Sequence, residues 1–521
     1  MNITTVRLSA VAAALGVLAA GAGVLAGTGV AALTNGPSPL VAVGNAVIER
    51  TPGPLKDYAI RTFGENDKTV LLAGAAVVLA LIAAVAGVIG LRHRRVALGI
   101  VVVVGLLALA ATLTDGTTAA SRALTLLAPI ATLVVAVVSL DLLLRRTAPL
   151  AEAVRVPASR DGDDVRAGFD RRAFVLTVLG TAAVGVVGGV ITRVAGGARA
   201  AASRAGIKIP KPADAAGPLP SGLDPVDGIS PYLTPNRDFY RVDTALTVPD
   251  VPADTWRLRI HGAVDNELDL DFADLLSQRL VERRITLTCV SNEVGGPYVG
   301  NATWIGVPLA DLLEQAGVKA GADALKSTSA DGMVIGTPLE AVTDGRDALV
   351  AVAMNGEPLP LEHGFPARMV VPGLYGYVSA TKWLVDIEVT RFADFTAYWT
   401  EREWDEQAPI KLSSRIDVPR AFEQVPRDRV VAGGVAWAQG VGIATVEVSV
   451  DDGPWERARL APQDTVDTWR QWSWRWSDAT PGAHTISVRT TDADGNTQTS
   501  DRVPPRPNGS TGRHSVRFTV E

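Results

Sequence analysis

Long apolar runs dominate the N-terminal part of the chain. Five of these runs contain no Asp, Glu, Lys, Arg or His, and they cover residues 8–33, 70–91, 96–113, 123–140 and 173–192. A helix of about 20 apolar residues spans the hydrocarbon core of a bilayer. The pattern therefore predicts a membrane domain of about five transmembrane helices over residues 1–195. The alternatives are helices buried in a soluble protein and, for the first run alone, a cleavable signal peptide, although its apolar stretch is longer than usual.

The pattern changes after the last apolar run. Residues 196–229 are rich in Ala, Gly and Pro, and they predict a semi-extended linker. Folded sequence resumes in residues 230–405, where a β-type run at residues 285–288 opens into a polar, Gly-rich segment at residues 291–296. This succession is typical of a strand that ends in a loop, and strand ends present side chains to clefts.

The C-terminal residues 408–521 show a third pattern. Val446, Val448 and Val450 alternate with polar residues, and turn residues separate such runs. The alternation predicts an all-β sandwich of immunoglobulin type that lacks a disulfide. The Trp472-Ser-Trp-Arg-Trp476 run places three indoles on one strand face, which we interpret as sandwich core or interface; a carbohydrate platform is the alternative.

Composition limits the functions that remain. The net charge is −6, whereas a nucleic-acid partner calls for a basic patch. The single cysteine, Cys289, cannot form an internal disulfide, so the compartment must be inferred from topology. Because the apolar runs hold no histidine or other ionisable residue, no haem is expected in this chain, and the helices are interpreted as an anchor or docking surface.

Basic residues between the apolar runs predict the orientation of the membrane domain. Residues 92–95 read Arg-His-Arg-Arg, residues 115–122 carry one arginine, and residues 145–172 carry seven. Arginine and lysine are retained on the cytoplasmic side. The N-terminus is therefore expected inside and the large C-terminal part outside. Residues 34–68, with four basic residues, would also lie outside, which is a mild conflict.

A paired arginine precedes the last apolar run. Arg171 and Arg172 are followed by Ala173, Phe174 and an apolar stretch, which resembles the twin-arginine export motif. The alternative is a positive-inside anchor with two arginines by chance. Both interpretations place the C-terminal part outside the cytoplasm.

Cys289 lies at the predicted strand end. Free cysteine is among the most buried residue types, so a structural role and a chemical role both remain open from the residue alone. The segment around it, however, resembles the sulfite oxidase family of molybdopterin-dependent oxidoreductases. The match is Cys289-x-x-Asn292, followed by Gly-Asn-x-x-Trp304-x-Gly-x-x-Leu309.

This resemblance implies an α+β molybdopterin-binding domain at residues 230–405, in which Cys289 donates its thiolate to molybdenum and is therefore metal ligand and catalytic residue. A soft thiolate suits a redox-active metal of high valence. The sandwich resembles the dimerisation domain of the same family, which implies a homodimer through residues 408–521. The resemblance covers the chain from residue 230 onward.

Two further segments carry the resemblance. Around Tyr240, the family has an arginine, matched by Arg241, and then a histidine, where this chain has Asp243 or Thr244; an aromatic-anchored strand start is the alternative. The run from residue 354 to residue 368 matches at its histidine and its arginine, and a Gly-rich loop with a lysine follows. A guanidinium fork suits a phosphate. The implied cofactor-binding residues are Tyr240, Arg241, Asp243, Cys289, Asn292, His363, Arg368, Thr381 and Lys382, and Arg241 is also a catalytic candidate.

Two departures from the family pattern concern the substrate. Relatives that oxidise sulfite have an arginine where this chain has Val294, and a tyrosine five residues after a tryptophan, where this chain has Trp404 after Trp399. The pocket is therefore expected to be more apolar and less selective for anions.

The function that follows is a hypothesis with two rivals. We expect a multi-pass protein of the cell membrane whose outward-facing part carries molybdenum-molybdopterin and performs two-electron oxygen-atom transfer on a small substrate. Its electron-transfer partner is not identified by the sequence. The rivals are a sulfite oxidase or dehydrogenase proper, and a surface module that has lost catalysis and cofactor.

Overall fold

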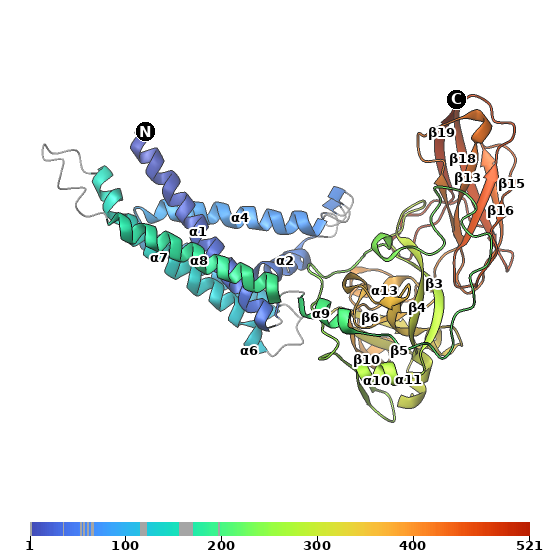
Figure 1. The fold of residues 1–521 in the computed structure, drawn as a ribbon, viewed down its shortest axis with the longest axis horizontal. Coiled ribbons are helices and arrows are strands. Elements are labelled where there is room, and N and C mark those ends of the chain that lie inside the picture. Colours follow the sequence, from blue (N-terminus) through green and yellow to red (C-terminus); the bar gives the residue numbers. More distant parts are fainter. Residues whose placement is uncertain are drawn as a thin grey trace. The chain divides into compact units, whose positions relative to one another are not determined.

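The computed structural model of the chain describes residues 3–34, 36–52, 55, 58–59, 62–63, 67–114, 122–155, 170–195 and 198–521. They form two compact units (Figure 1). The first comprises Met1–Arg199 and Ala245–Asp250, and the second comprises Ala200–Thr244 and Val251–Glu521.

Helices make up the first unit. They are α1 (Ile3–Thr34), α2 (Pro39–Arg50), α4 (Asp67–Gly90), α5 (Arg94–Thr114), α6 (Arg122–Thr125), α7 (Leu127–Arg155) and α8 (Arg171–Ala195). In the described part of the chain, five helices are long and apolar enough to cross a membrane, over Val6–Thr34, Asp67–Gly90, Arg94–Thr114, Leu127–Glu152 and Arg171–Arg193. Each predicted apolar run lies largely on one of these helices, although the run 123–140 begins before Leu127 and includes part of α6.

The fourth of these helices extends further than its apolar run. It continues past residue 140 and includes Asp141, whose carboxylate pairs with Arg94 at the start of α5 and with Arg145 at 2.8 Å. Because two arginines neutralise the acid, the helix can continue through Asp141. The apolar run predicted from the sequence ended just before this residue.

Small residues occupy the contacts between the long helices. Helix α1 packs against α4, α7 and α8 (Figure 1). A Cβ atom at Gly16 would lie 2.0 Å from the Ala83 carbonyl oxygen, and one at Gly87 would lie 2.0 Å from the Ala12 carbonyl oxygen, so the backbones of α1 and α4 approach closely only because both residues are glycine. Many large side chains point outward instead, as Leu81 does with 62% exposure. This distribution is typical of helices that pack in lipid.

Part of the predicted orientation cannot be compared with the structure. Residues 115–121 and 156–169, which contribute to the loop charges, lie outside the described residues. Arg171 and Arg172 occupy the first turn of α8. Asp170 precedes them, and its Oδ1 accepts a hydrogen bond from the Ala173 N–H at 2.9 Å. The paired arginines therefore coincide with a capped helix start.

The segment predicted as a linker belongs to the second unit from residue 200 onward. It forms α9 (Ala198–Gly206), from which Arg204 donates to the Pro358 and Leu359 carbonyls at 2.8 Å. Further on, the Ala213 N–H donates to the Leu280 carbonyl and the Glu282 N–H donates to the Asp214 carbonyl, both at 2.8 Å. The segment thus covers part of the outer edge of strand β3, whose backbone groups would otherwise face solvent.

Two sheets form the α+β part of the second unit. The first has the order β3-β4-β7-β8, with β9 also paired to β7, and the second has the order β2-β1-β10-β5-β6. The strands of the first sheet are β3 (Val281–Thr288), β4 (Val299–Pro308), β7 (Leu349–Met354), β8 (Glu357–Pro358) and β9 (Arg368–Val370). Those of the second are β1 (Arg257–Gly262), β2 (Leu268–Asp271), β5 (Ala324–Ser329), β6 (Val334–Pro338) and β10 (Leu384–Thr390).

Short helices connect and cover these strands, and the apolar core lies among them. The helices are α10 (Phe272–Ser277), α11 (Leu309–Ala316), α12 (Glu340–Thr343), α13 (Gly376–Ser379), and the 3-10 turns η3 (Asn236–Asp238), η4 (Leu361–His363), η5 (Phe392–Asp394) and η6 (Thr400–Arg402). Strand β7 is buried at every position, which agrees with its uninterrupted apolar sequence.

The C-terminal part is a β-sandwich, as predicted. One sheet has the order β11-β13-β17-β16 and the other β12-β19-β18-β14-β15. The strands are β11 (Ser413–Val418), β12 (Gln424–Val425), β13 (Val431–Trp437), β14 (Ile443–Val450), β15 (Glu456–Arg457), β16 (Arg459–Leu460), β17 (Arg470–Arg475), β18 (Gly482–Asp492) and β19 (His514–Val520), with η7 (Arg427–Arg429) between β12 and β13. Trp472 and Trp474 are buried in the core between the sheets, which confirms the core interpretation for both.

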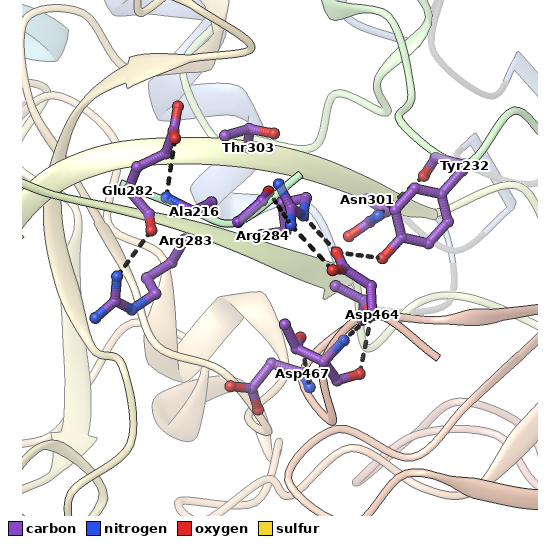
Figure 2. A network of polar contacts seen from close by, with 12 residues as sticks. Ala216, Tyr232, Glu282, Arg283, Arg284, Asn301, Thr303, Asp464 and Asp467 are labelled. Atoms are coloured by element: carbon purple, nitrogen blue, oxygen red, sulfur yellow. Dashed lines mark hydrogen bonds and ion pairs between the residues drawn. The ribbon is translucent and has the colours of Figure 1, made fainter. Parts of the chain in front are cut away.

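A buried ion pair joins the sandwich to β3. Asp464 lies between Arg284 of β3 and the Tyr232 hydroxyl, which donates to it at 2.8 Å (Figure 2). Next to it, the Thr286 N–H donates to the Asp467 carbonyl at 3.0 Å. The strand that leads into Cys289 is therefore held by both parts of the second unit.

Candidate active site

Cys289 begins a loop that returns the chain from β3 to β4, and residues 289–298 are called the cysteine loop below. The Cys289 N–H donates to the Tyr298 carbonyl at 2.9 Å, which closes the loop at its base. Inside the loop, the Asn292 N–H donates to the Cys289 carbonyl at 3.0 Å, and Asn292 Oδ1 accepts from the Tyr298 N–H at 2.8 Å. The Cys289 side chain thus sits on a braced turn at a strand end, as the sequence pattern predicted.

A cavity of about 120 Å³ lies next to this cysteine. It is bordered by loops from both α+β sheets and by the segment that precedes the sandwich. Among the predicted site residues, those that line it are Tyr240, Asp243, Cys289, His363, Arg368, Thr381 and Lys382. Residues more than 140 positions apart in the sequence therefore meet around one thiol.

Two predicted site residues do not line this cavity. Arg241 forms an ion pair with Asp243 at 2.9 Å, and its side chain is 40% exposed, so it acts on the cavity through Asp243. Asn292 braces the cysteine loop and borders a second, smaller pocket between the loop and the sandwich. Neither placement gives them direct contact with a molecule in the cavity.

Arg368 is a buried cation whose hydrogen bonds, among the described residues, go to carbonyl groups and to no carboxylate. It is 5% exposed, its hydrogen bonds go to the carbonyls of Met369, His363 and Ala380, and its guanidinium lies 5.2 Å from the Trp304 ring centroid. Among the described residues no carboxylate pairs with it. Burial lowers its pKa to about 10, which leaves it charged at neutral pH. An uncompensated buried guanidinium is an anion-binding group.

Lys382 is a second buried cation, but it has a partner. Its Nζ lies 2.7 Å from Asp243 Oδ2, and the two side chains are 10% and 2% exposed. Burial lowers the pKa of Lys382 to about 8, although the charge of Asp243 acts in the opposite direction. Lys382 therefore stays mainly protonated at neutral pH because Asp243 is there.

His363 and Thr381 supply neutral hydrogen-bonding groups. Burial, followed by the charge of Arg368, lowers the pKa of His363 to about 4, so the imidazole is neutral at pH 7. Its Nε2 donates to the Asn236 carbonyl at 3.0 Å, which leaves Nδ1 as an acceptor. The Thr381 hydroxyl lies 2.6 Å from the Ser327 hydroxyl.

Ser291 is a neighbour of the thiol that sequence reasoning did not single out. Its backbone N–H and its hydroxyl approach the Cys289 sulfur, and both favour the thiolate, whereas burial is the larger effect and raises the pKa of Cys289. Asp331 and Met333 also line the cavity, from the turn between β5 and β6. No motif marks that turn, because only the pairing of β5 with β10 brings it to the site.

Aromatic side chains border the cavity beyond the charged residues. Trp399 and Trp404 are in edge contact with ring centroids 6.3 Å apart, and Tyr377 lies 5.9 Å from Trp404. Of the two departures noted in the sequence, Trp404 lines the cavity as expected, whereas Val294 borders the second, smaller pocket. The apolar character of this border therefore comes from the tryptophans and not from Val294.

The residues present fit an anionic cofactor that also needs a thiolate. A buried guanidinium to which no described carboxylate is hydrogen-bonded, a buried ammonium and a thiol line one cavity. These donors match a molybdenum-molybdopterin group, which carries a phosphate and accepts a thiolate ligand.

Comparisons with known proteins agree with this chemistry. Residues 245–399 match the family model described as an oxidoreductase molybdopterin-binding domain. The chain is 32% identical over 289 residues to human mitochondrial sulfite oxidase, which covers 47% of this chain and 52% of that protein. It is 35% identical over 163 residues to the uncharacterized oxidoreductase YuiH of Bacillus subtilis, covering 30% of this chain and 79% of that protein.

The crystal structure of the sulfane dehydrogenase SoxCD from Paracoccus pantotrophus is similar with a TM-score of 0.49 and 24% identity, over 57% of this chain and 86% of that one. The chain spans about half the length of the sulfite oxidases that it matches. With the cavity, the family model and the match to most of YuiH taken together, the chain belongs to the sulfite oxidase family of molybdopterin-dependent oxidoreductases.

Proposed function

We propose that this chain is a membrane-anchored molybdenum oxidoreductase whose second unit lies outside the cytoplasm and transfers an oxygen atom to or from a small neutral or bulky substrate. The observation that carries the proposal is a single cavity that combines the Cys289 thiol, the unpaired guanidinium of Arg368 and an aromatic border. The apolar helices of the first unit and the basic loops support the anchor and its orientation.

Five cavity residues have a defined task in this proposal. Cys289 provides the thiolate ligand, while Arg368 and Lys382 hold the anionic part of the cofactor. Asp243 keeps Lys382 protonated, and the Nδ1 of His363 is free to accept a hydrogen bond from the cofactor. Molybdenum-molybdopterin bound here would supply two-electron redox chemistry with transfer of an oxygen atom.

The substrate proposal rests on the aromatic border. Trp399, Trp404 and Tyr377 line the cavity and offer flat apolar faces, which favour a neutral or bulky molecule over a small dianion. An organic sulfoxide is such a molecule, and its reduction is balanced as R₂SO + 2 H⁺ + 2 e⁻ → R₂S + H₂O. In an assay, a chemically reduced viologen dye supplies the two electrons.

Sulfite oxidation is the rival reaction, because several relatives carry that name. It is balanced as SO₃²⁻ + H₂O → SO₄²⁻ + 2 H⁺ + 2 e⁻. Steady-state kinetics on both substrates separates the two. We expect turnover of the sulfoxide and a specificity constant for sulfite below about 10⁴ M⁻¹s⁻¹, and a higher value for sulfite would overturn the substrate proposal.

Metal analysis separates the enzyme from a non-catalytic surface module. The full-length chain, expressed with cofactor supply and purified in detergent, is expected to hold about one molybdenum per chain. A chain that folds and contains no molybdenum under these conditions would favour the module. A homodimer through the sandwich, and an electron-transfer partner, complete the proposal; the molar mass in detergent tests the dimer.

A further inference from the structure

A loop of the sandwich contacts both the cysteine loop and the aromatic border of the cavity. It comprises residues 503–511 and is called the 503–511 loop. Val503 and Thr511 close it with two backbone hydrogen bonds of 3.2 Å. From the other side, Lys411 Nζ donates to Asn508 Oδ1 and to the Gly509 carbonyl, both at 2.7 Å. The loop is therefore tied down at its ends and at its middle.

The C-terminal end of this loop holds the cysteine loop. Ser510 Oγ donates to the Asn292 carbonyl at 2.6 Å, and both residues are buried. This carbonyl belongs to the residue that directly follows Ser291, whose N–H and hydroxyl approach the Cys289 sulfur. A buried carbonyl that loses its donor is costly, so Ser510 restricts where this peptide can lie.

The middle of the loop holds the segment that carries Trp404. Pro507 accepts a backbone hydrogen bond from the Asp405 N–H at 3.2 Å, and Asn508 Nδ2 donates to Asp405 Oδ2 at 2.6 Å. Arg506 adds a cation-π contact, with its guanidinium 5.8 Å from the Trp404 ring centroid. Asp405 directly follows Trp404, so these contacts limit the position of the indole at the cavity.

We propose that the 503–511 loop is a positioning element of the active site, in which Ser510 sets the cysteine loop and Asn508 sets the segment that carries Trp404. Neither residue lines the cavity, so both act through the residues they hold. The sandwich then helps to position the active site, in addition to being a candidate for dimerisation. The inference concerns how firmly the cysteine loop and the segment that carries Trp404 are held in place. It rests on the proposed function only for the expected effect on molybdenum binding.

Two variants of the same loop test this proposal, because each is expected to change hydrogen exchange in a different segment. The segment that changes is called the footprint of the variant. The full-length chain in detergent is prepared without cofactor as wild type, Ser510→Ala and Asn508→Ala. Hydrogen exchange of peptides is followed by mass spectrometry, together with the alkylation rate of Cys289, which is the only cysteine. Ser510→Ala is expected to accelerate exchange in the cysteine loop and alkylation of Cys289 by about three- to tenfold, the range for one lost hydrogen bond. Asn508→Ala is expected to accelerate exchange in residues 404–408 instead.

A matched control and a rescue make the result specific. Ser487→Ala removes a hydroxyl that lies 2.8 Å from Ser515 between two sandwich strands, and it is expected to leave both footprints unchanged. Ser510→Thr retains the hydroxyl and is expected to restore the wild-type rates. When loaded with cofactor, Ser510→Ala is expected to retain less molybdenum than Ser487→Ala.

Two results would overturn the proposal. One is a Ser510→Ala chain whose cysteine loop exchanges and reacts like that of the Ser487→Ala control. The other is an equal acceleration throughout the second unit, which would show general loosening and no positioning. If the footprints appear but the wild-type chain binds no molybdenum, the positioning inference stands and the proposed function fails.

Discussion

Replacing Asp464 by asparagine is expected to destabilise the second unit strongly. Its carboxylate accepts hydrogen bonds from Arg284 on both oxygens and from the Tyr232 hydroxyl at 2.8 Å (Figure 2). The side chains of Arg284 and Asp464 are only 8% and 7% exposed. Asparagine keeps the shape of the side chain. It removes the countercharge, however, and its amide group can place a donor against the donors of Arg284.

The structure sets the size of the effect. Removing one partner of a buried ion pair costs about 3–5 kcal/mol, because the other charge is left buried and unpaired. In a folded part as large as the second unit, this lowers Tm by roughly 5–10 °C. Asp269→Asn is the matched control, since it breaks an ion pair with Arg257 whose side chains are 54% and 62% exposed. Such a surface pair contributes about 0–1 kcal/mol.

Intrinsic tryptophan fluorescence is the suitable assay. All eleven tryptophans lie beyond residue 255, so thermal unfolding in detergent reports the second unit without a signal from the long apolar helices. Adding Arg284→Met to Asp464→Asn removes the stranded charge and is expected to recover part of the loss. The reasoning fails if Asp464→Asn lowers Tm no more than Asp269→Asn does.

Three further predictions test other parts of the molecule. Burial, followed by the charge of Arg415, lowers the pKa of His514 to about 4. Between this pKa and the pKa of about 6.5 in the unfolded chain, the His514 imidazole is protonated in the unfolded chain but neutral in the folded chain. The free energy of unfolding therefore falls by roughly 3 kcal/mol as the pH drops from about 6.5 to about 4. His514→Asn keeps an acceptor for the Ile416 N–H and should flatten this loss in fluorescence melts, whereas an unchanged acid slope contradicts the assignment. Cys289→Ser is expected to lose molybdenum and activity, because a neutral hydroxyl is a poor donor to a high-valent metal; an active, molybdenum-loaded variant would refute this. When a reporter is fused after Glu521, we expect its signal to show that the C-terminus lies outside the cytoplasm. A signal from the cytoplasm alone would contradict the predicted topology.

Several features of the fold and of the site could be predicted from the sequence because they depend on short-range patterns. A helix of apolar residues and a strand with alternating faces are set by neighbours a few positions apart, so the five long helices and the sandwich were predicted. The position of Cys289 at a strand end follows in the same way from the run before it and the glycines after it. The match at His363 and Arg368 came from spacing within one segment.

Other parts depend on contacts that no local pattern encodes. Val294 was expected in the substrate pocket, but Gly295 has a φ of +83° and a Cβ there would lie 2.3 Å from the His514 ring, so the loop turns Val294 toward the smaller pocket. The linker was predicted to be semi-extended, and the structure adds that its residues 213 and 214 pair along the outer edge of β3. Both outcomes follow from unpaired or closely packed groups that become neighbours only in the folded chain.

The sequence by itself therefore determined which segments form long apolar helices, where a strand opens into a loop, and which residues resemble a molybdopterin site. Tertiary structure alone decided that Asp243 pairs with Lys382, that the β5-β6 turn borders the cavity, and that Ser510 reaches the cysteine loop from 218 residues away. The physical reason is range: periodicity and turn chemistry act between near neighbours, whereas the charge balance and shape of a buried site are set by side chains that only folding brings together.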